Sequence, residues 1–340
     1  MNYIYISSGS FGAEVLKHLD PKPTLVITGV DKLGGRGMKE MIQTPVKKLC
    51  LELHISFVEV KNKLDLRDRI YDLGEDQSLL KSKILNPKSC LYLLADFGII
   101  IPQELLQVNE FGIWNIHPSL LPKYRGTTPI QTALLNDEKV TGVTLMQMDE
   151  KIDHGPIITQ EKLTIDINDT NINLQTKLAH LGAHLFNEQT FRLSDLKTFR
   201  PQDHRLATFT KKLTKDDGFV PLAELAPYLE PIFKKYNLLH LLKSVEISRS
   251  QSKLVAISRS QLKLGNRPIV TNYNQLQPIP TNCNQLQLHN KIRALTPWPT
   301  VWTRLVDESV VKITESTYDE RAKLTTIIEI ERNGKKYRFK

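Results

Sequence analysis

The sequence predicts an α/β fold in which a Rossmann-like, doubly wound domain precedes a small OB-like β domain. Short apolar strands alternate with helical segments over the first 200 residues, a pattern typical of a parallel sheet covered by helices. The C-terminal end carries only strand-like runs, and a Gln-, Asn- and Ser-rich segment precedes it. We therefore predict a first domain at 1–200, a linker at 201–220, a low-complexity insert at 221–288 and the β domain at 289–340.

The N-terminal elements predict where a ligand would bind. Apolar strands are expected at 3–7, 24–30, 91–94 and 113–117, and a glycine-containing loop at 8–12 leads into a helix at 13–19. This strand–loop–helix opening is the start of a doubly wound domain, although the full dinucleotide fingerprint is absent. Ligands of such sheets lie at the carboxyl ends of the strands. The end of the strand at 113–117 is therefore a candidate site.

Composition excludes several classes of protein. Hydrophobic residues make up 40% of the chain and charged residues 24%, and no run approaches the roughly 18–20 apolar residues of a membrane span. The N-terminus lacks the pattern of a secretory signal. Cys50, Cys90 and Cys283 show neither a disulfide framework nor metal-ligand spacing. We expect a cytoplasmic, monomeric protein that does not bind a membrane and has no metal site.

Charge is divided unevenly along the chain. Residues 201–340 contain 23 Lys and Arg against 13 Asp and Glu, a net charge of +10, whereas residues 1–200 contain 23 against 24, a net charge of −1. A neutral half beside a basic half suits a small-molecule site next to a surface that binds a polyanion. Basic residues that only keep the C-terminal part in solution would explain the same numbers.

Three residues have the chemistry of acyl transfer to an amine. Asn115 and His117 lie two positions apart on a predicted strand and therefore point to the same side. An amide can donate to a developing oxyanion, and an imidazole can act in acid–base catalysis. Asp153 follows His117 by 36 residues (153 − 117) and could orient it. Each residue alone is more commonly a turn former, a helix cap or a structural histidine.

The surrounding motifs carry a family resemblance. The chain reads Asn-Ile-His-Pro-Ser-Leu-Leu-Pro from 115, Thr-Gly-Val-Thr-Leu-Met-Gln-Met-Asp from 141 and Ile-Asp-His-Gly-Pro from 152. It resembles the folate-dependent formyltransferases, and among them the methionyl-tRNA formyltransferases, over most of 1–220 and again at 289–305. The resemblance implies that Asn115, His117 and Asp153 are catalytic. It also implies formyl transfer from 10-formyltetrahydrofolate to the α-amine of initiator methionyl-tRNA, without a metal.

The resemblance also implies where the folate would bind. The residues implied are Leu94, Ala95, Asp96, Phe97, Gly98, Ser119, Leu120, Leu121 and Pro122. Two departures from the family fall in or near this set. Asp96 stands where relatives commonly have alanine, and the first loop reads Ser-Gly-Ser where relatives have Gly-Thr-Pro. Arg125, which follows the Leu-Leu-Pro turn, is expected to form a structural ion pair.

Two basic segments are implied to contact tRNA. The glycine-rich loop within 31–46 resembles the loop that the tRNA-specific branch places against the acceptor stem, with Arg36 and Lys39 as contacts. The linker resembles one that can face the tRNA, which adds Lys211, Lys212 and Lys215 as phosphate contacts. Solvated surface segments would have the same composition.

The C-terminal part departs from the family pattern. Ile-Ser-Arg-Ser-Gln occurs at 247–251 and 257–261, and a second repeat occurs at 271–277 and 281–287. A low-complexity expansion is the preferred interpretation of this insert, and a basic RNA-contacting arm is the alternative. Only three strands are expected after it, at 310–314, 325–330 and 336–339. A five-stranded barrel needs more, so the β domain is predicted to be truncated.

Two other functions remain open from the sequence. One is a tRNA-binding homologue that has lost catalysis, against which the intact Asn, His and Asp set argues. The other is formyl transfer to an amino sugar nucleotide, which would not need the loop that contains Arg36. An Arg36→Ala variant separates the tRNA and sugar acceptors, because only transfer to tRNA is expected to fall.

Overall fold

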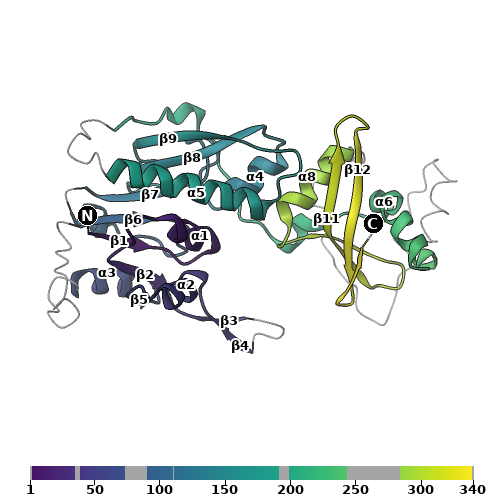
Figure 1. Cartoon of the computed structure of the whole chain (residues 1–340), viewed down its shortest axis with the longest axis horizontal. Coiled ribbons are helices and arrows are strands. Elements are labelled where there is room, and N and C mark those ends of the chain that lie inside the picture. The colour runs from purple at the N-terminus through teal and green to yellow at the C-terminus, as the bar shows by residue number, and fades with distance from the viewer. Residues whose placement is uncertain are drawn as a thin grey trace, which may run out of the picture. The chain divides into compact units, whose positions relative to one another are not determined.

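The computed structural model describes residues 2–34, 39–72, 90–109, 111–190, 199–242 and 284–338. They form two compact units that divide between Lys212 and Leu213 (Figure 1). The first unit is built on a seven-stranded sheet and the second on a four-stranded sheet. In these ranges no helix is long and apolar enough to cross a membrane.

The sheet of the first unit has the strand order β5-β2-β1-β6-β7-β8-β9. Its strands are β1 (Tyr3–Ile6), β2 (Leu25–Gly29), β5 (Phe57–Val60), β6 (Leu91–Leu94), β7 (Ile113–His117), β8 (Val140–Gln147) and β9 (Ile157–Thr164). The first five in the sheet are parallel, as predicted, whereas β8 and β9 are antiparallel to their neighbours. The loop between β8 and β9 is short, and only antiparallel strands can be joined without a long crossover.

The helices of the first unit pack against its sheet and against each other. They are α1 (Ser10–His18), α2 (Pro45–Leu53), α3 (Lys63–Asp72), α4 (Pro129–Leu135) and α5 (Asn171–Thr190), with short 3-10 turns η1 (Gln103–Gln107) and η3 (His204–Leu206). Helix α5 packs on α1 and against β7, β8 and β9. Every residue of β1, β2, β6 and β7 is buried. This continuous burial is typical of parallel strands that are covered on both faces. Residues at the ends of these strands are therefore held by the packed core.

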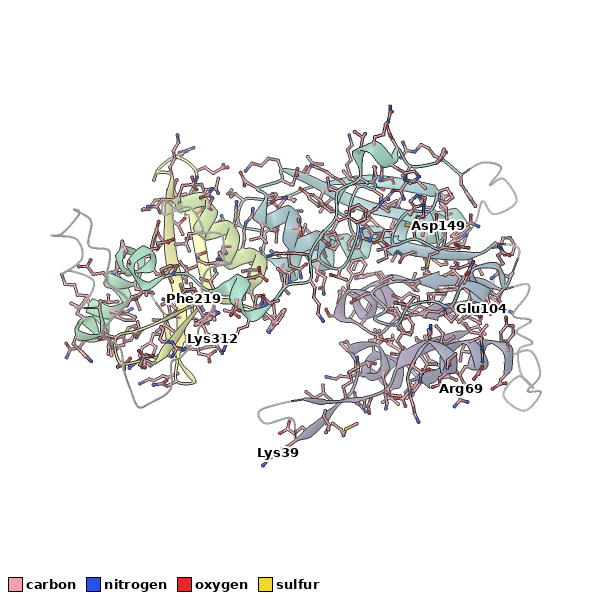
Figure 2. The ribbon with its side chains drawn as sticks, turned by 180° about the vertical axis from the view of Figure 1, so that it is seen from behind. Lys39, Arg69, Glu104, Asp149, Phe219 and Lys312 are labelled. Carbon is pink, nitrogen blue, oxygen red and sulfur yellow. The ribbon has the colours of Figure 1, made fainter. Side chains whose placement is uncertain are left out.

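A two-stranded hairpin extends from the first unit between β2 and α2. Its strands are β3 (Lys32–Gly34) and β4 (Glu40–Ile42), which pair antiparallel and are largely exposed. Lys39 lies at the end of this hairpin (Figure 2). Arg36 lies outside the described residues, so its predicted role is not addressed by the structure.

The second unit has an antiparallel sheet of order β10-β11-β12-β13. Its elements are η4 (Lys215–Gly218), α6 (Leu222–Lys235), η5 (Leu239–Leu241), α8 (Gln285–Leu295), β10 (Val301–Arg304), β11 (Val310–Asp319), β12 (Leu324–Arg332) and β13 (Lys335–Arg338). Helix α8 packs against β10, β11 and β12. Strand β10 was not predicted, because it begins two residues after Pro299 and is only four residues long. The sheet therefore has four described strands where three were expected.

The segment predicted as an insert begins with a packed helix. Leu225, Leu229, Ile232 and Phe233 of α6 are buried, and their spacing of three to four places them on one face. That face packs against β10 and β12. Low-complexity sequence therefore does not begin at 221, because apolar periodicity over 222–235 builds a core helix. The repeats predicted at 247–287 lie almost entirely outside the described residues.

Candidate active site

Strand β7 presents Asn115 and His117 at its carboxyl end, where the sequence places them. The two side chains are 7% and 4% exposed. Asn115 pairs with Leu94 of the parallel neighbour β6 and with Met146 of the antiparallel neighbour β8. The site therefore lies where the sheet changes from parallel to antiparallel. A strand paired on both sides is rigid, so both side chains are held in place by the centre of the fold.

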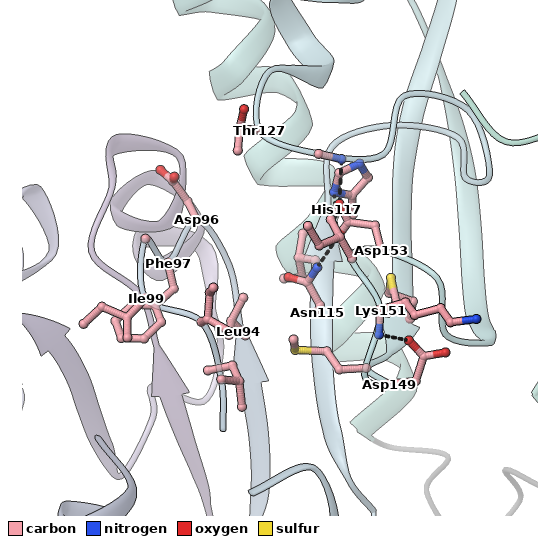
Figure 3. Close-up of a pocket in the computed structure, with 18 of the residues that line it drawn as sticks. Leu94, Asp96, Phe97, Ile99, Asn115, His117, Thr127, Asp149, Lys151 and Asp153 are labelled. Atoms are coloured by element: carbon pink, nitrogen blue, oxygen red, sulfur yellow. Dashed lines mark hydrogen bonds and ion pairs between the residues drawn. The ribbon is translucent and has the colours of Figure 1, made fainter. Parts of the chain in front are cut away.

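The loop between β8 and β9 brings Asp153 to these two residues (Figure 3). Asn115 Nδ2 donates to Asp153 Oδ1 at 3.4 Å, and His117 Nδ1 lies 3.6 Å from the same oxygen. The backbone amide of Gly126 donates to Asp153 Oδ2 at 2.8 Å. Asp153 has a left-handed backbone with φ +48°. The predicted carboxylate thus contacts both the predicted amide and the predicted imidazole.

One tautomer of neutral His117 fits its surroundings. His117 Nε2 lies 3.0 Å from the carbonyl oxygen of Tyr124. A carbonyl can only accept, so Nε2 carries a proton and donates it. In the neutral ring Nδ1 is then left with a lone pair on the side of Asp153. The nitrogen that can gain or lose a proton in the site is therefore Nδ1.

A cavity of about 1020 Å³ opens beside the three residues. In Figure 3, Leu94, Asp96, Phe97 and Ile99 form one side, and Asn115, His117 and Asp153 face them from the other. Apolar side chains make up about half of the lining and polar or charged side chains the rest, so the cavity offers both apolar surface and hydrogen-bonding groups to a small organic molecule. No group of three or more His, Cys, Asp or Glu side chains in the described ranges could hold a metal ion.

The structure separates the residues predicted to bind folate into two groups. Leu94, Asp96, Phe97 and Gly98 line the cavity. Ala95 is fully buried and is not among the lining residues, and neither are Ser119, Leu120, Leu121 and Pro122. The latter four form a turn held by Thr144, whose hydroxyl accepts from Leu121 N and donates to the carbonyl of Ser119. This turn follows closely on the catalytic strand β7, and contact of these four residues with folate stays a prediction.

The two departures from the family pattern meet in space. Helix α1 begins after Gly9, which has no side chain to cap it. Asp96 Oδ2 instead accepts from the Phe11 amide at 3.0 Å and so caps the helix from the loop after β6. Burial raises the pKa of the Asp96 carboxyl, and hydrogen bonds from the Phe11 and Gly12 amides oppose that shift. Glycine at 9 leaves the space that this carboxylate occupies.

Gly9→Ala is expected to lower the free energy of unfolding by about 0.5–2 kcal/mol, the usual value of a helix cap. An added Cβ would lie 1.9 Å from Asp96 Oδ2, so the carboxylate would have to move away from the Phe11 amide. The measurement is urea unfolding of the wild type and the variant. In an Asp96→Ala background the same change should cost nothing, because no cap remains to be lost.

Gly98→Ala is the matched control for this cycle, since a Cβ at 98 meets no atom within 4 Å. It should change stability by less than about 0.5 kcal/mol. Equal costs of Gly9→Ala in the two backgrounds would contradict the cap.

The residues predicted to contact tRNA are placed on both units. Lys39 is exposed on the hairpin, and Lys211 and Lys212 are exposed at the end of the first unit. Lys215 belongs to the second unit, where its Nζ lies 5.2 Å from the centre of the Trp302 ring. Of the five residues predicted to contact tRNA, Lys39, Lys211 and Lys212 are therefore exposed on the unit that contains the catalytic residues.

Sequence reasoning missed the residues that support the catalytic set. Arg125 is 3% exposed, and among the described residues its guanidinium has neutral hydrogen-bond partners in place of the expected ion pair. Its Nη2 instead donates to Gln202 Oε1 at 2.6 Å and to His204 Nδ1 at 2.8 Å. Burial lowers the pKa of Arg125, against the attraction of Asp153 and Asp149. These contacts come from distant segments, and only the position of Arg125 beside the motif hinted at them.

Comparison with known proteins agrees with this geometry. The family model described as "Formyl transferase" matches residues 7–190, and "Formyl transferase, C-terminal domain" matches residues 279–336. A methionyl-tRNA formyltransferase of Methylacidiphilum infernorum is 34% identical over 242 residues, which are 70% of this chain and 72% of that protein. The methionyl-tRNA formyltransferase of Carboxydothermus hydrogenoformans is 36% identical over 240 residues, with coverages of 70% and 73%.

Solved structures share the fold at lower identity. An N-formyltransferase of Helicobacter canadensis, solved with folinic acid and dTDP-3-aminofucose, has a TM-score of 0.53 and 18% identity, and the match covers 94% of this chain and 88% of that one. The sugar 3N-formyltransferase WlaRD has a TM-score of 0.53 and 20% identity, with coverages of 94% and 87%. At 18–20% identity these structures show only that the fold is similar. From the family models and the sequence relatives, the chain belongs to the formyl transferase family.

Proposed function

We propose that this enzyme transfers the formyl group of 10-formyltetrahydrofolate to the α-amine of initiator methionyl-tRNA, giving formylmethionyl-tRNA for translation initiation. The observation that carries the proposal is the contact of Asn115, His117 and Asp153 beside a large cavity. It occurs in a chain whose relatives at 34–36% identity over 70% of its length are methionyl-tRNA formyltransferases.

The cavity fits a folate as co-substrate. Phe97, Ile99 and Met148 supply apolar surface for a flat ring system, and the chain at 94–98 passes along the wall. A volume of about 1020 Å³ exceeds what a ring alone requires and leaves space for an attached chain. The co-substrate supplies an activated formyl group, and every other part of the chemistry falls to the protein.

The reaction proposed for this site is a simple exchange of bonds at the formyl carbon. The nitrogen lone pair of the amine forms the new C–N bond, and the formyl oxygen becomes an oxyanion. Asn115 Nδ2 donates to this oxygen, and so does His117 Nδ1 when the ring carries a second proton. The amine sheds one proton to the Asp153 carboxylate, the oxyanion reforms the carbonyl as the bond from the formyl carbon to N10 breaks, and Asp153 passes its proton to N10 as tetrahydrofolate leaves. Atoms and charge balance without a metal.

The two oxygens of the Asp153 carboxylate have different contacts, which suits the proposed proton transfer. Oδ1 lies between Asn115 Nδ2 and His117 Nδ1, whereas Oδ2 is held by the Gly126 amide. A carboxylate anchored at one oxygen keeps the other available for a proton. His117 is anchored in the same way, because Nε2 is committed to Tyr124 and Nδ1 faces the site.

The test is formyl transfer from 10-formyltetrahydrofolate to Met-charged initiator tRNA, with a dTDP-linked amino sugar as the alternative acceptor. Transfer to the tRNA with at least a hundredfold higher kcat/KM than to the sugar is expected. Transfer to the sugar alone would replace the proposed acceptor. Binding of tRNA without transfer to either acceptor would identify a non-catalytic homologue.

The linker lysines are proposed to contact tRNA phosphates. The double variant Lys211→Ala/Lys212→Ala is expected to raise KM for tRNA and leave KM for the folate unchanged. Each lost phosphate contact should reduce the slope of log affinity against log salt by about one. The measurement is tRNA binding between low and physiological salt. Lys162→Ala, at an exposed position of β9, is the matched control and should change neither quantity. An unchanged salt slope in the double variant would remove both lysines from the interface.

We propose a cytoplasmic monomer, for which the buried free thiols of Cys50 and Cys90 are supporting observations. We also propose that catalysis belongs to the first unit and that Arg36, Lys39 and Lys215 complete the tRNA contacts. Light scattering of the purified chain tests the monomer.

A further inference from the structure

The chain at 202–211 lies against both loops that hold the catalytic side chains. It follows β9 and α5 in sequence, and it belongs to the first compact unit. The sequence describes this segment only as a linker with basic residues at its end. Its hydrogen bonds indicate that it also supports the catalytic residues, and the first of these contacts is made by the buried side-chain amide of Gln202.

Gln202 bridges the two catalytic loops. Its side chain is 6% exposed. Gln202 Nε2 donates to the carbonyl oxygens of Asp153 and Gly155, at 3.0 and 2.7 Å, and Oε1 accepts from Arg125 Nη2 at 2.6 Å. The amide therefore uses both of its donors and its acceptor. Two of the three bonds hold the backbone around Asp153, the residue with the left-handed φ of +48°.

The contacts form a closed ring around the catalytic carboxylate. Gln202 holds the Asp153 carbonyl and Arg125, and Gly126, the next residue in the chain, donates its amide to the Asp153 carboxylate. Asp153 is thus fixed at its backbone and at its side chain by one loop and one linker residue. Aspartate adopts the left-handed conformation more readily than most residues, so these bonds hold the position of the carboxylate and need not offset backbone strain.

Further along, the linker pairs with the loop that anchors His117. The Arg125 amide donates to the Thr208 carbonyl at 2.8 Å, and the Thr210 amide donates to the Arg125 carbonyl at 2.7 Å. The Tyr124 amide donates to the Thr208 hydroxyl at 2.8 Å. Tyr124 is the residue whose carbonyl accepts from His117. The linker therefore supports the anchor of the imidazole as well as that of the carboxylate.

We propose that Gln202 is a positioning residue that acts on the reaction through Asp153, within a linker segment that supports both loops that hold the catalytic side chains. This inference rests on the proposed function for its reaction, but the contacts on which it stands do not depend on the acceptor. Lys211 ends this segment and Lys212 follows it, so the proposed tRNA contacts are continuous in sequence with the residues that support the catalytic loops.

Two substitutions separate the contacts of Gln202. Gln202→Met preserves length and removes all three hydrogen bonds. Gln202→Glu keeps an acceptor for Arg125 but cannot donate to the Asp153 and Gly155 carbonyls. Gln160→Met is the matched control, because Gln160 Nε2 donates to the Leu121 carbonyl and the Thr144 hydroxyl and Oε1 accepts from Arg200. Gln160 does not line the cavity.

Kinetics of the folded variants test the assignment. Gln202→Met and Gln202→Glu are each expected to lower kcat by about 10- to 100-fold with less than a threefold change in either KM, whereas Gln160→Met keeps the wild-type values. In an Asp153→Asn background, Gln202→Met should have no further effect, because its route to the reaction is gone. A full additional loss in that background, or wild-type kcat in Gln202→Met, would overturn the proposal.

Hydrogen exchange gives a readout that does not depend on activity. Amides of the loop between β8 and β9 should exchange at least tenfold faster in Gln202→Met than in Gln160→Met, with unchanged exchange in β1 and β6. Equal exchange in the two variants would overturn the positioning role even if the wild type showed no transfer to tRNA. Faster exchange together with an inactive wild type would support the positioning role and reject the proposed acceptor.

Discussion

Asp153→Asn is expected to lower kcat for formyl transfer by about 10³- to 10⁴-fold, the loss typical when the carboxylate beside a catalytic histidine becomes an amide. Asparagine has nearly the same shape, and its Oδ1 can still accept from the Gly126 amide. It cannot accept a proton from the amine, and its uncharged amide no longer stabilises an imidazolium 3.6 Å away. Single-turnover formylation of Met-charged initiator tRNA measures the effect.

Asp137→Asn is the matched control for this variant. Asp137 also has a left-handed backbone, with φ +55° against +48° at Asp153, and it also contacts a cationic side chain, Lys139 at 3.0 Å. Asparagine tolerates this conformation, so neither change should lower the unfolding temperature appreciably. Asp137→Asn should retain the wild-type rate. A rate within tenfold of wild type in Asp153→Asn would mean that this carboxylate takes no part in proton transfer.

Asn115→Leu is expected to lower kcat by about 10²- to 10³-fold, the usual cost of losing one donor to an oxyanion. The leucine side chain has a similar volume, so the buried strand β7 should keep its pairing with β6 and β8. KM for both substrates should change little, because the donor acts when charge develops on the formyl oxygen. Steady-state kinetics with the folate and with the tRNA varied in turn measure the two constants separately.

A raised KM with unchanged kcat would contradict this role of Asn115, since it would show that the amide binds the ground state as strongly as the transition state. Circular dichroism of the variant controls for folding. The combination of Asn115→Leu with Asp153→Asn should be less costly than the product of the single effects, because Asn115 Nδ2 also donates to Asp153 Oδ1.

The sequence predicted the first domain well because its signals are local. Apolar strands at 91–94 and 113–117 match β6 and β7, and the two-residue spacing of Asn115 and His117 on one strand required no tertiary information. The family resemblance agrees with the formyl transferase models matched at 7–190 and 279–336. The second unit was predicted less completely, since α6 lies in the segment assigned to the insert and β10 is only four residues long.

Other parts could not be predicted because they depend on contacts between distant segments. Asp96 and Gly9 are separately unusual, and only their proximity shows that one caps the helix for which the other leaves room. Ser119–Pro122 carry a strong motif, and only the structure shows that they form a turn bound to Thr144. A motif in sequence does not distinguish a residue that contacts a ligand from one that supports the residue that does.

The sequence by itself determined the chemistry of this protein: the residue types at 115, 117 and 153, the strand that carries two of them, and the α/β class. Period-two alternation and buried apolar strands are properties of the local chain, so they can be read without a structure. Only the tertiary structure decided which nitrogen of His117 carries the proton and which residues hold the catalytic side chains in place. The Tyr124 carbonyl selects the tautomer of His117, and Gln202, 49 residues beyond Asp153, fixes the backbone of that carboxylate. Such pairings arise when segments distant in sequence pack together, and no local pattern specifies them.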